Sequence, residues 1–343
     1  MNETVMLGHG SGGSMMKRII DEVFFAAYAG EDLLRGDDAA VLSSGELAPG
    51  ERLAFSTDSF VVTPHFFPGG DIGRLAVCGT VNDVATSGAR PLWLSCGFIL
   101  EEGYPMDDLR RICASMAEAA REAGVVIVTG DTKVVNHGHG DGVFINTSGI
   151  GVVPAGVELG GAQCRPGDAV LLSGTLGDHG IAIMSCREGL SFTTDVRSDA
   201  APLNGLIADV MAAAPGAVRC FRDPTRGGLA STLNELAAQS QSDIEVEEDA
   251  VPVRDSVHGA CDMLGYDVFQ VANEGKMVCV VAPEAAETAL AAMRAHRYGA
   301  DAAIIGSVAA ADADRGPRVT VCNAFGGRRI LDMLVGEQLP RIC

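Results

Sequence analysis

Residues 105–131 read PMDDLRRICASMAEAAREAGVVIVTGD, and this stretch decides the fold class. In its first part, apolar residues recur every three or four positions, which is the spacing of an amphipathic helix. The helix is expected to begin after Pro105 and to end at Gly124. The apolar run at 125–129 that follows has the length of a buried strand. A helix followed directly by a strand indicates a fold in which both kinds of element share one core.

The same alternation extends toward the N-terminus. Residues 53–57 (LAFST) have the length of a strand, and a second helix is expected from Asp71 as its N-cap to just before Gly88. Asp58 follows the first strand and Asp131 follows the second, so both acids are expected at the rim of the sheet. The first half of the chain is therefore predicted to be α/β or α+β.

The second half mixes the same two kinds of element after a Gly- and Pro-rich junction at 154–167. A total of 343 residues fits about two domains. The chain is predicted to divide into a Gly-rich loop and helix (1–35), two mixed domains (36–155 and 156–333) and a mobile tail (334–343). Strands are expected at 169–173, 276–282, 303–309 and 318–322, and helices at 202–214, 228–240 and 284–297.

The composition excludes several classes of protein. With 25 Lys and Arg against 45 Asp and Glu, the net charge is -20, and no local basic patch suggests nucleic-acid binding. The uncharged stretch at 142–157 is shorter than the ~20 residues that cross a bilayer. No secretory signal is visible at the start, and the ten cysteines form no C-x-x-C pair. We expect a cytoplasmic protein that binds no membrane.

Aspartates in small-residue contexts are the most informative feature. They occur in GDDAA (36–40), STDS (56–59), VNDV (81–84), GDTK (130–133) and RDPTRGG (222–228). Carboxylates that converge repel one another, and a divalent cation such as Mg²⁺ relieves the repulsion while holding substrate phosphates. The pattern suggests a metal-nucleotide site. The alternative is that each Asp caps a helix or closes a turn.

Four further residues have a functional and an ordinary interpretation. The Gly-rich segment at 8–14, which contains His9, is either a flap over a site or a disordered terminus, and it matches no P-loop or Rossmann motif. Lys133 and Glu274 are surface charges, or a cation for a transferring phosphoryl group and a general base. Cys343, the last residue, is either a cysteine without a function or a thiol that carries a covalently attached group into an active site.

Taken together, these segments closely resemble the HypE family of hydrogenase maturation factors, in the aminoimidazole-ribonucleotide-synthetase superfamily of ATP-dependent enzymes. The resemblance runs essentially end to end. Its telling segments are HGSGG (9–13), AFSTDS (54–59), FFPGG (66–70), LSCGFILEE (94–102), VTGDTKVV (128–135), SGTLGDHG (173–180), ANEGK (272–276) and the terminal PRIC (340–343). It implies two domains of the superfamily's type, the first of which binds ATP and dimerises.

The resemblance also implies an ATP-driven dehydration. Cys343 would accept a carbamoyl group from the partner HypF, and ATP would convert the resulting S-carboxamide to a thiocyanate. The nitrile would pass as cyanide to iron held by HypC and HypD, for the [NiFe] hydrogenase centre. By position, Asp38, Asp83 and Asp223 match metal ligands, and Asp58 lies beside the nucleotide or metal.

The same comparison assigns the remaining site residues. Gly130, Asp131 and Thr132 should lie against ATP, Glu274 with Lys133 should remove a proton from the carboxamide nitrogen, and the loop around His9 should close over the site. The family forms homodimers with a shared barrel. Selenophosphate synthetase is the nearest rival, but its loop cysteine or selenocysteine is absent here. Aminoimidazole-ribonucleotide synthetase and thiamine-phosphate kinase need no terminal cysteine, and a non-catalytic scaffold is the alternative from another class.

Overall fold

The computed structural model describes residues 4–6, 19–28, 47–187, 195–312, 314–333 and 342–343. His9, Asp38 and tail residues 334–341 therefore lie outside the described residues. The mobility predicted for the tail stays a prediction there. Of the helix expected after the Gly-rich loop, the described part contains a π-helical turn (Ile20–Phe25) and the short helix α2 (Ala26–Tyr28).

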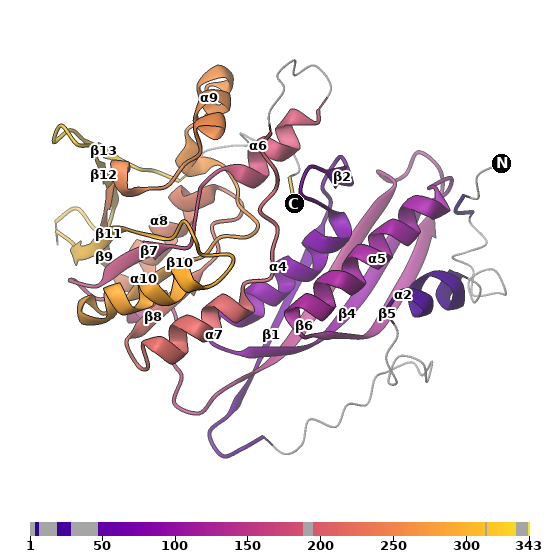
Figure 1. The fold of residues 1–343 in the computed structure, drawn as a ribbon, viewed down its shortest axis with the longest axis horizontal. Coiled ribbons are helices and arrows are strands. Elements are labelled where there is room, and N and C mark those ends of the chain that lie inside the picture. The colour runs from indigo at the N-terminus through magenta and orange to yellow at the C-terminus, as the bar shows by residue number, and fades with distance from the viewer. Residues whose placement is uncertain (1–3, 7–18, 29–46, 188–194, 313, 334–341) are drawn as a thin grey trace.

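A four-stranded sheet forms the first domain (Figure 1). Its order is β1-β6-β4-β5, with β4 and β5 parallel and the other neighbours antiparallel. The strands are β1 (Arg52–Phe60), β4 (Arg90–Glu101), β5 (Val126–Val135) and β6 (Val143–Val153), and a small hairpin joins β2 (Phe66–Phe67) to β3 (Gly70–Asp71). Strand β1 lies at the edge nearest the second domain and β5 at the far edge.

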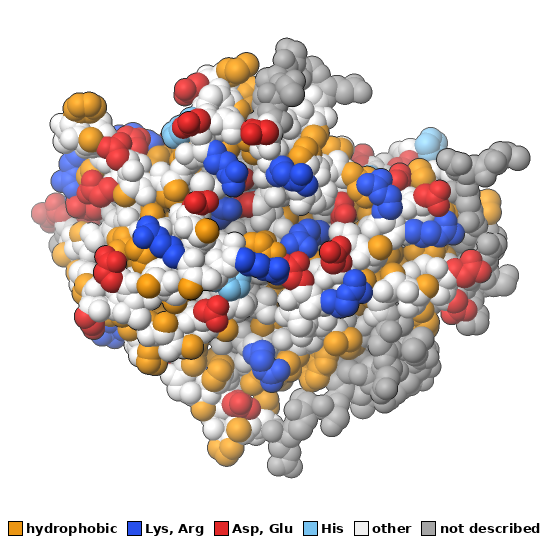
Figure 2. All heavy atoms as spheres, viewed as in Figure 1, with side chains coloured by type: hydrophobic (Ala, Val, Ile, Leu, Met, Phe, Trp, Pro, Cys, Tyr) orange, Lys and Arg blue, Asp and Glu red, His pale blue; other side chains and the backbone are white. Residues whose placement is uncertain are grey.

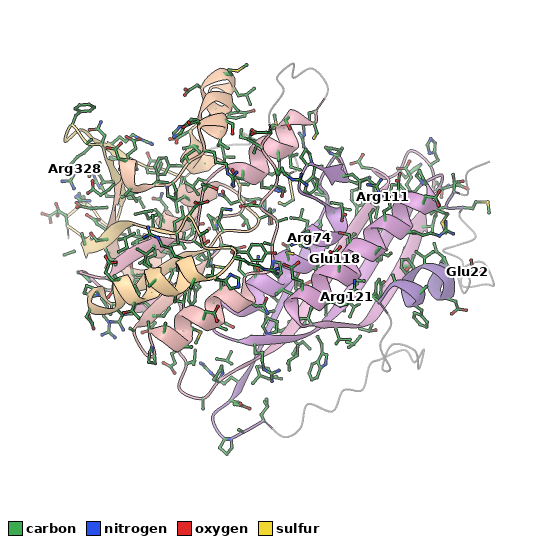
Figure 3. The ribbon with its side chains drawn as sticks, in the orientation of Figure 1. Glu22, Arg74, Arg111, Glu118, Arg121 and Arg328 are labelled. Atoms are coloured by element: carbon green, nitrogen blue, oxygen red, sulfur yellow. The ribbon has the colours of Figure 1, made fainter. Side chains whose placement is uncertain are left out.

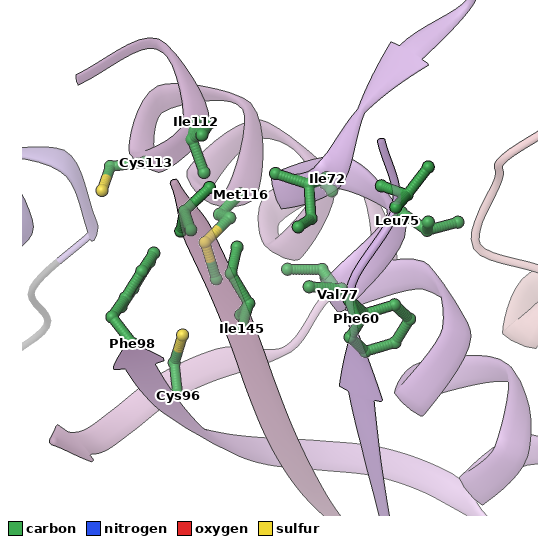
Figure 4. Packing of buried hydrophobic residues seen from close by; sticks show 14 of the residues in the cluster. Phe60, Ile72, Leu75, Val77, Cys96, Phe98, Ile112, Cys113, Met116 and Ile145 are labelled. Atoms are coloured by element: carbon green, nitrogen blue, oxygen red, sulfur yellow. The ribbon is translucent and has the colours of Figure 1, made fainter. Parts of the chain in front are cut away.

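Two helices cover one face of this sheet, and both helices were predicted. Helix α4 (Ile72–Thr86) begins at Asp71, whose carboxylate accepts hydrogen bonds from the backbone amides of Gly73 and Arg74. Helix α5 (Met106–Ala123) ends at Gly124, which has a left-handed conformation. Figure 4 shows how side chains from both helices pack onto the strands: Ile72, Leu75, Ile112 and Met116 from the helices, Phe60, Phe98 and Ile145 from the strands.

The opposite face of the first sheet, called the open face below, carries no described helix. Large apolar side chains lie exposed on it: Leu53, Phe55, Ile99 and Val126. Because successive side chains of a strand point to opposite faces, Asp58 faces α4 whereas Asp131 lies on the open face. Both acids lie within their strands. The expectation that they follow the strands at a rim is therefore wrong, because β1 and β5 continue beyond them.

The second domain is a seven-stranded sheet with helices on both faces. Its order is β13-β12-β9-β11-β7-β10-β8. The strands are β7 (Ala169–Leu172), β8 (Val218–Arg222), β9 (Ser242–Glu247), β10 (Val278–Val281), β11 (Ala303–Ala310), β12 (Val319–Cys322) and β13 (Arg328–Ile330). The α-helices are α6 (Asp178–Ser185), α7 (Asn204–Ala213), α8 (Gly228–Ser240), α9 (Asp255–Leu264) and α10 (Ala286–Ala295). The predicted mixed α/β class, in two domains, is confirmed.

Helix α4 lies where the two domains meet, which explains why it is apolar on nearly every side. The buried Asn82 joins the domains: its amide donates to the carbonyl of Ala201, and its carbonyl accepts from the amide of Leu203. Asp83, the next residue, points away from that contact toward the cavity described below. The C-terminus lies at the same junction, between α6 and the β2 hairpin (Figure 1).

The surface mixes charges of both signs. Figure 2 shows Lys and Arg interspersed with Asp and Glu over one face. Along α5, Arg111, Glu118 and Arg121 point outward from the sheet, and Arg74 of α4 lies nearby (Figure 3). Within the described part of the chain, no helix has the length and apolar character to span a bilayer.

Candidate active site

A cavity of about 470 Å³ lies between the two domains. It collects five of the predicted site residues from distant parts of the chain: Asp58 from β1, Asp83 from α4, Asp223 after β8, Glu274 before β10 and Cys343 at the C-terminus. Arg222 and Arg226 also line it. With Glu235, which also lines it, the cavity combines five side-chain carboxyl groups, two guanidinium groups and a thiol.

The two acids from the first domain are held by short local contacts. Asp58 accepts a hydrogen bond from the backbone amide of Ser59 at 2.7 Å, and Asp83 accepts one from the Ser56 hydroxyl at 2.9 Å. Burial raises the pKa of both carboxyl groups above the usual range, although these hydrogen bonds oppose the shift. The negative charge of Asp58 raises the pKa of Asp83 further. The two carboxylates thus repel one another in a poorly solvated place.

The two acids from the second domain are more strongly perturbed. Burial, followed by the charge of Asp83, raises the pKa of Asp223 to about 7. Burial raises the pKa of Glu274 well above its usual value, and the charges of Asp223 and Asp199 add to the effect. Glu274 is 4% exposed, and its Oε1 atom has no hydrogen-bond partner among the residues that the structure describes. A buried carboxyl oxygen without a partner is costly to the fold, which points to a ligand or a reaction as its reason.

Cys343 lies beside these acids. Burial, followed by the charge of Glu274, raises the pKa of its thiol to about 12, while Arg226 opposes the shift. The unmodified cysteine is therefore a neutral thiol in this position. This environment does not activate a nucleophile, and it suits a sulfur that enters the cavity with its group already attached.

Of the predicted site residues that the structure describes, those of β5 do not lie in this cavity. Gly130, Asp131, Thr132 and Lys133 lie on β5, three strands away from β1, which corresponds to about 14 Å. Lys133 Nζ donates to Asp131 Oδ1 at 2.6 Å on the open face. Position 130 requires a glycine for a structural reason, because a Cβ there would lie 2.3 Å from the carbonyl oxygen of Cys96.

A magnesium ion fits this donor set only together with other ligands. Carboxylate oxygens are the ligands that Mg²⁺ prefers, and the mutual repulsion of Asp58, Asp83 and Asp223 favours a cation among them. Yet among the described residues no three acidic, His or Cys side chains are close enough to hold a metal alone. Mg²⁺ commonly completes its shell with water and substrate phosphates, so this arrangement is compatible with a Mg²⁺-nucleotide complex.

Sequence reasoning left Arg226 unassigned and missed Ser56, Phe55 and Thr57. The charge of Arg226 lowers the pKa of Asp58, Asp83 and Cys343, which places its guanidinium among them. Phe55 and Thr57 line the cavity although they belong to the open face. For Ser56 the available signal was Asp58, two positions along β1, because alternate residues of one strand share a face. The cavity therefore opens onto the open face along β1.

Replacing Asp223 by Asn is expected to stabilise the metal-free protein near pH 7 by roughly 4 kcal/mol. The unfolded chain releases this proton near pH 4, whereas the folded protein keeps it until about pH 7. The folded protein thus binds more protons in that window, and its stability falls as the pH rises. Urea unfolding at pH 5 and pH 8 tests this. The free energy of unfolding should fall less between these pH values in Asp223→Asn than in the unmodified protein, and an equal fall in both would contradict the prediction.

Comparison with known proteins finds relatives for both domains. Residues 36–153 match the family described as AIR synthase related protein, N-terminal domain, and residues 165–316 match its C-terminal domain. The carbamoyl dehydratase HypE of Azotobacter vinelandii is 56% identical over 342 residues, which cover 100% of this chain and 98% of the relative. The chain is thus similar to a dehydratase along its whole length.

Two solved structures are also similar. The hydrogenase maturation protein HypE in complex with ATP is 51% identical, with a TM-score of 0.93, covering 99% of this chain and 100% of that one. The HypE chain of a HypE–HypF complex is 50% identical, with a TM-score of 0.79, covering 92% of this chain and 99% of that one. The similarity therefore extends to proteins crystallised with a nucleotide and with a protein partner.

Proposed function

The chain belongs to the HypE family of carbamoyl dehydratases, and from this premise we propose that it converts an S-carboxamide on Cys343 to a thiocyanate at the expense of ATP. The observation that carries the proposal is the position of Cys343, the last residue of the chain, beside Glu274 and the aspartates in the interdomain cavity. A chain end placed inside an acidic, partly enclosed cavity suits a substrate that the protein carries on itself.

The reaction balances in two steps. The carboxamide oxygen attacks the γ-phosphorus of ATP, ADP leaves, and the nitrogen gives up its first proton. The nitrogen then gives up its second proton as the carbon–oxygen bond breaks, phosphate leaves, and the carbon–nitrogen triple bond of the thiocyanate forms. Phosphorylation matters because an amide oxygen is a poor leaving group and phosphate is a good one.

The described residues divide the work. Mg²⁺ held by Asp58, Asp83 and Asp223 would neutralise the phosphates and the acids around Glu274. Glu274 in its ionised form would accept a proton from the carboxamide nitrogen, on the Oε1 atom that has no partner among the described residues. Arg226 lies where it can face the transferred phosphoryl group. The enclosure between the domains limits access of water to the phosphorylated intermediate.

The open face of the first sheet suggests that the site is completed by a second copy of the chain. Leu53, Phe55 and Val126 would be buried if two open faces packed together. The cavity opens onto this face through Phe55 and Thr57, while Asp131 and Lys133 lie on the same face at the far edge. We propose a homodimer in which Lys133 and residues 130–132 of one subunit serve the ATP site of the other.

Mixing two inactive variants tests this arrangement. Lys133→Ala and Glu274→Gln should each abolish dehydration alone. If Lys133 acts across the interface, every mixed dimer keeps one intact site. Random reassociation then restores about a quarter of the activity of the unmodified protein. If Lys133 acts within its own chain, no site is intact and the mixture stays inactive, which would exclude the shared site.

The partners follow from the same premise. We propose that HypF supplies the carbamoyl group, in line with the similar HypE–HypF complex. HypC and HypD are proposed to receive the nitrile as a cyanide ligand of the hydrogenase iron. All ten cysteines are free thiols, which fits work in the reducing cytoplasm.

Phosphate release under single-turnover conditions tests the proposed function. Protein with a known content of carbamoyl groups is mixed with excess Mg-ATP. We expect one phosphate for each carbamoyl group and almost none from uncarbamoylated protein or from Cys343→Ala. ATP turnover that does not depend on the carbamoyl content would show that the substrate is a different acceptor.

A further inference from the structure

The end of the chain is held at two backbone positions outside the acidic cluster. An oxygen of the terminal carboxylate of Cys343 accepts a hydrogen bond from the amide of Val61 at 3.1 Å. The carbonyl oxygen of Ile342 lies 2.5 Å from Nε2 of His179. Val61 belongs to the first domain and His179 to α6 of the second, so both domains hold the chain end. These contacts involve backbone atoms and leave the thiol free to carry a group.

The protonation of His179 follows from its partners. A carbonyl oxygen only accepts, so the Nε2 atom that faces Ile342 must carry a proton. The other ring nitrogen, Nδ1, lies 2.8 Å from the hydroxyl of Ser198, and that hydroxyl oxygen accepts from the amide of Ala200. The Ser198 hydroxyl therefore donates to Nδ1 of the neutral ring. Three hydrogen bonds run in one direction from the Ala200 amide to the Ile342 carbonyl.

The surroundings of His179 fix the ring in this orientation. The side chain is fully buried, and burial lowers its pKa, which keeps the ring neutral although Asp199 and the Ile342 carbonyl oppose the shift. The Phe67 ring packs edge-on against it at 5.6 Å. Ile342 is itself 5% exposed, in a core cluster that includes Ile183 and Ala272 of the second domain. The recess is thus shaped for the last two residues.

We propose that His179, oriented by Ser198, is a positioning residue that docks the carbamoylated tail for dehydration. The inference rests on the proposed function and adds a role for a residue that lines no part of the catalytic cavity. When the tail leaves to meet a protein partner, Nε2 of His179 loses its acceptor in a buried place. Because an unsatisfied buried donor is unfavourable, the ring favours the docked tail.

Thiol labelling measures docking without any catalytic step. Cys186 and Cys322, the two other cysteines with exposed surface, are first replaced by Ser, so that Cys343 is the accessible thiol. We expect His179→Ala to raise the rate of Cys343 alkylation about tenfold, the equilibrium shift that accompanies one lost hydrogen bond. Unchanged alkylation in a folded His179→Ala protein would overturn the proposal.

Two variants separate docking from a merely structural role. His179→Gln places an amide donor near the Nε2 position and should keep alkylation within about twofold of the parent rate. His258→Ala removes an exposed histidine of α9 and should leave the rate of Cys343 alkylation unchanged. If His179→Gln were as reactive as His179→Ala, the hydrogen bond to Ile342 would not be the cause.

Single-turnover dehydration supplies the functional result. Carbamoylated His179→Ala should form thiocyanate about tenfold more slowly at saturating Mg-ATP, with ATP affinity unchanged and recovery in His179→Gln. If no variant dehydrated the group while alkylation still followed this order, the proposed function would fail and the docking role would stand. Equal dehydration rates in the parent and His179→Ala would refute the positioning role.

Discussion

Glu274→Gln is expected to lower the rate of dehydration by about 10³-fold while carbamoylation of Cys343 and binding of ATP persist. The reaction must remove two protons from the carboxamide nitrogen, and a glutamine amide accepts neither at neutral pH. The substitution keeps the size of the side chain, and the backbone amide of residue 274 still donates to Asp199. Rapid quenching followed by mass spectrometry of the tail gives the rate directly.

Glu235→Gln is the matched control. Glu235 lines the same cavity, but it forms an ion pair with Arg222 and has considerable exposed surface. Its loss should change the rate by less than about threefold, because partly exposed ion pairs contribute little. If Glu274→Gln retained the rate of the unmodified protein, the proton would have to leave by another route, and the assignment of Glu274 would be wrong.

Asp83→Asn is expected to reduce carbamoyl-dependent ATP turnover by about 10²–10³-fold, the range for losing one electrostatic element of a preorganised site. Asparagine preserves an oxygen that can accept the Ser56 hydrogen bond, so the change removes mainly charge. The concentration of Mg²⁺ needed for half-maximal turnover should rise. Titration of Mg²⁺ at fixed ATP in both proteins checks this.

The stability of the Asp83→Asn protein separates a metal ligand from a structural acid. Removing one of several repelling carboxylates should leave the melting temperature of the metal-free protein unchanged or higher. Asp168→Asn is the contrast: Asp168 is buried, accepts a hydrogen bond from the amide of Arg165 and pairs with Arg219, so its loss should lower stability. Normal Mg²⁺ dependence in Asp83→Asn would remove Asp83 from the metal site.

The helices of the first domain were predictable, whereas two of its four strands were not. Helix α4 begins after its N-cap Asp71, and helix α5 ends at Gly124. Both signals are visible in the local sequence. Strand β6 contains Gly149 and Gly151, which weaken the strand signal. Both glycines face α4, where an added Cβ would lie 2.9 Å from Thr80 and 2.7 Å from Val84. Packing against α4 thus requires these glycines, and no local sequence pattern reveals that tertiary contact.

The candidate site was predictable only in part, because some of its residues have a local sequence signal and others depend on tertiary contacts. The aspartates of the cavity could be found from their small-residue contexts and from the family resemblance, because both are visible in the sequence. The place of Lys133 across the open face depends on strand order, which residues 130–133 alone do not specify. His179 meets Ile342 across 163 positions of sequence. Such contacts are set by how the two domains meet.

The intact mass of S-carbamoylated protein, recorded before and after addition of Mg-ATP, tests the central claim most directly. The account predicts that the protein loses the mass of one water as the carboxamide becomes a thiocyanate, with the change confined to the peptide that ends in Cys343. Cys343→Ala should show neither the carbamoyl group nor the loss. An unchanged mass while ATP is consumed would contradict the account, because the phosphoryl group would then go to a different acceptor.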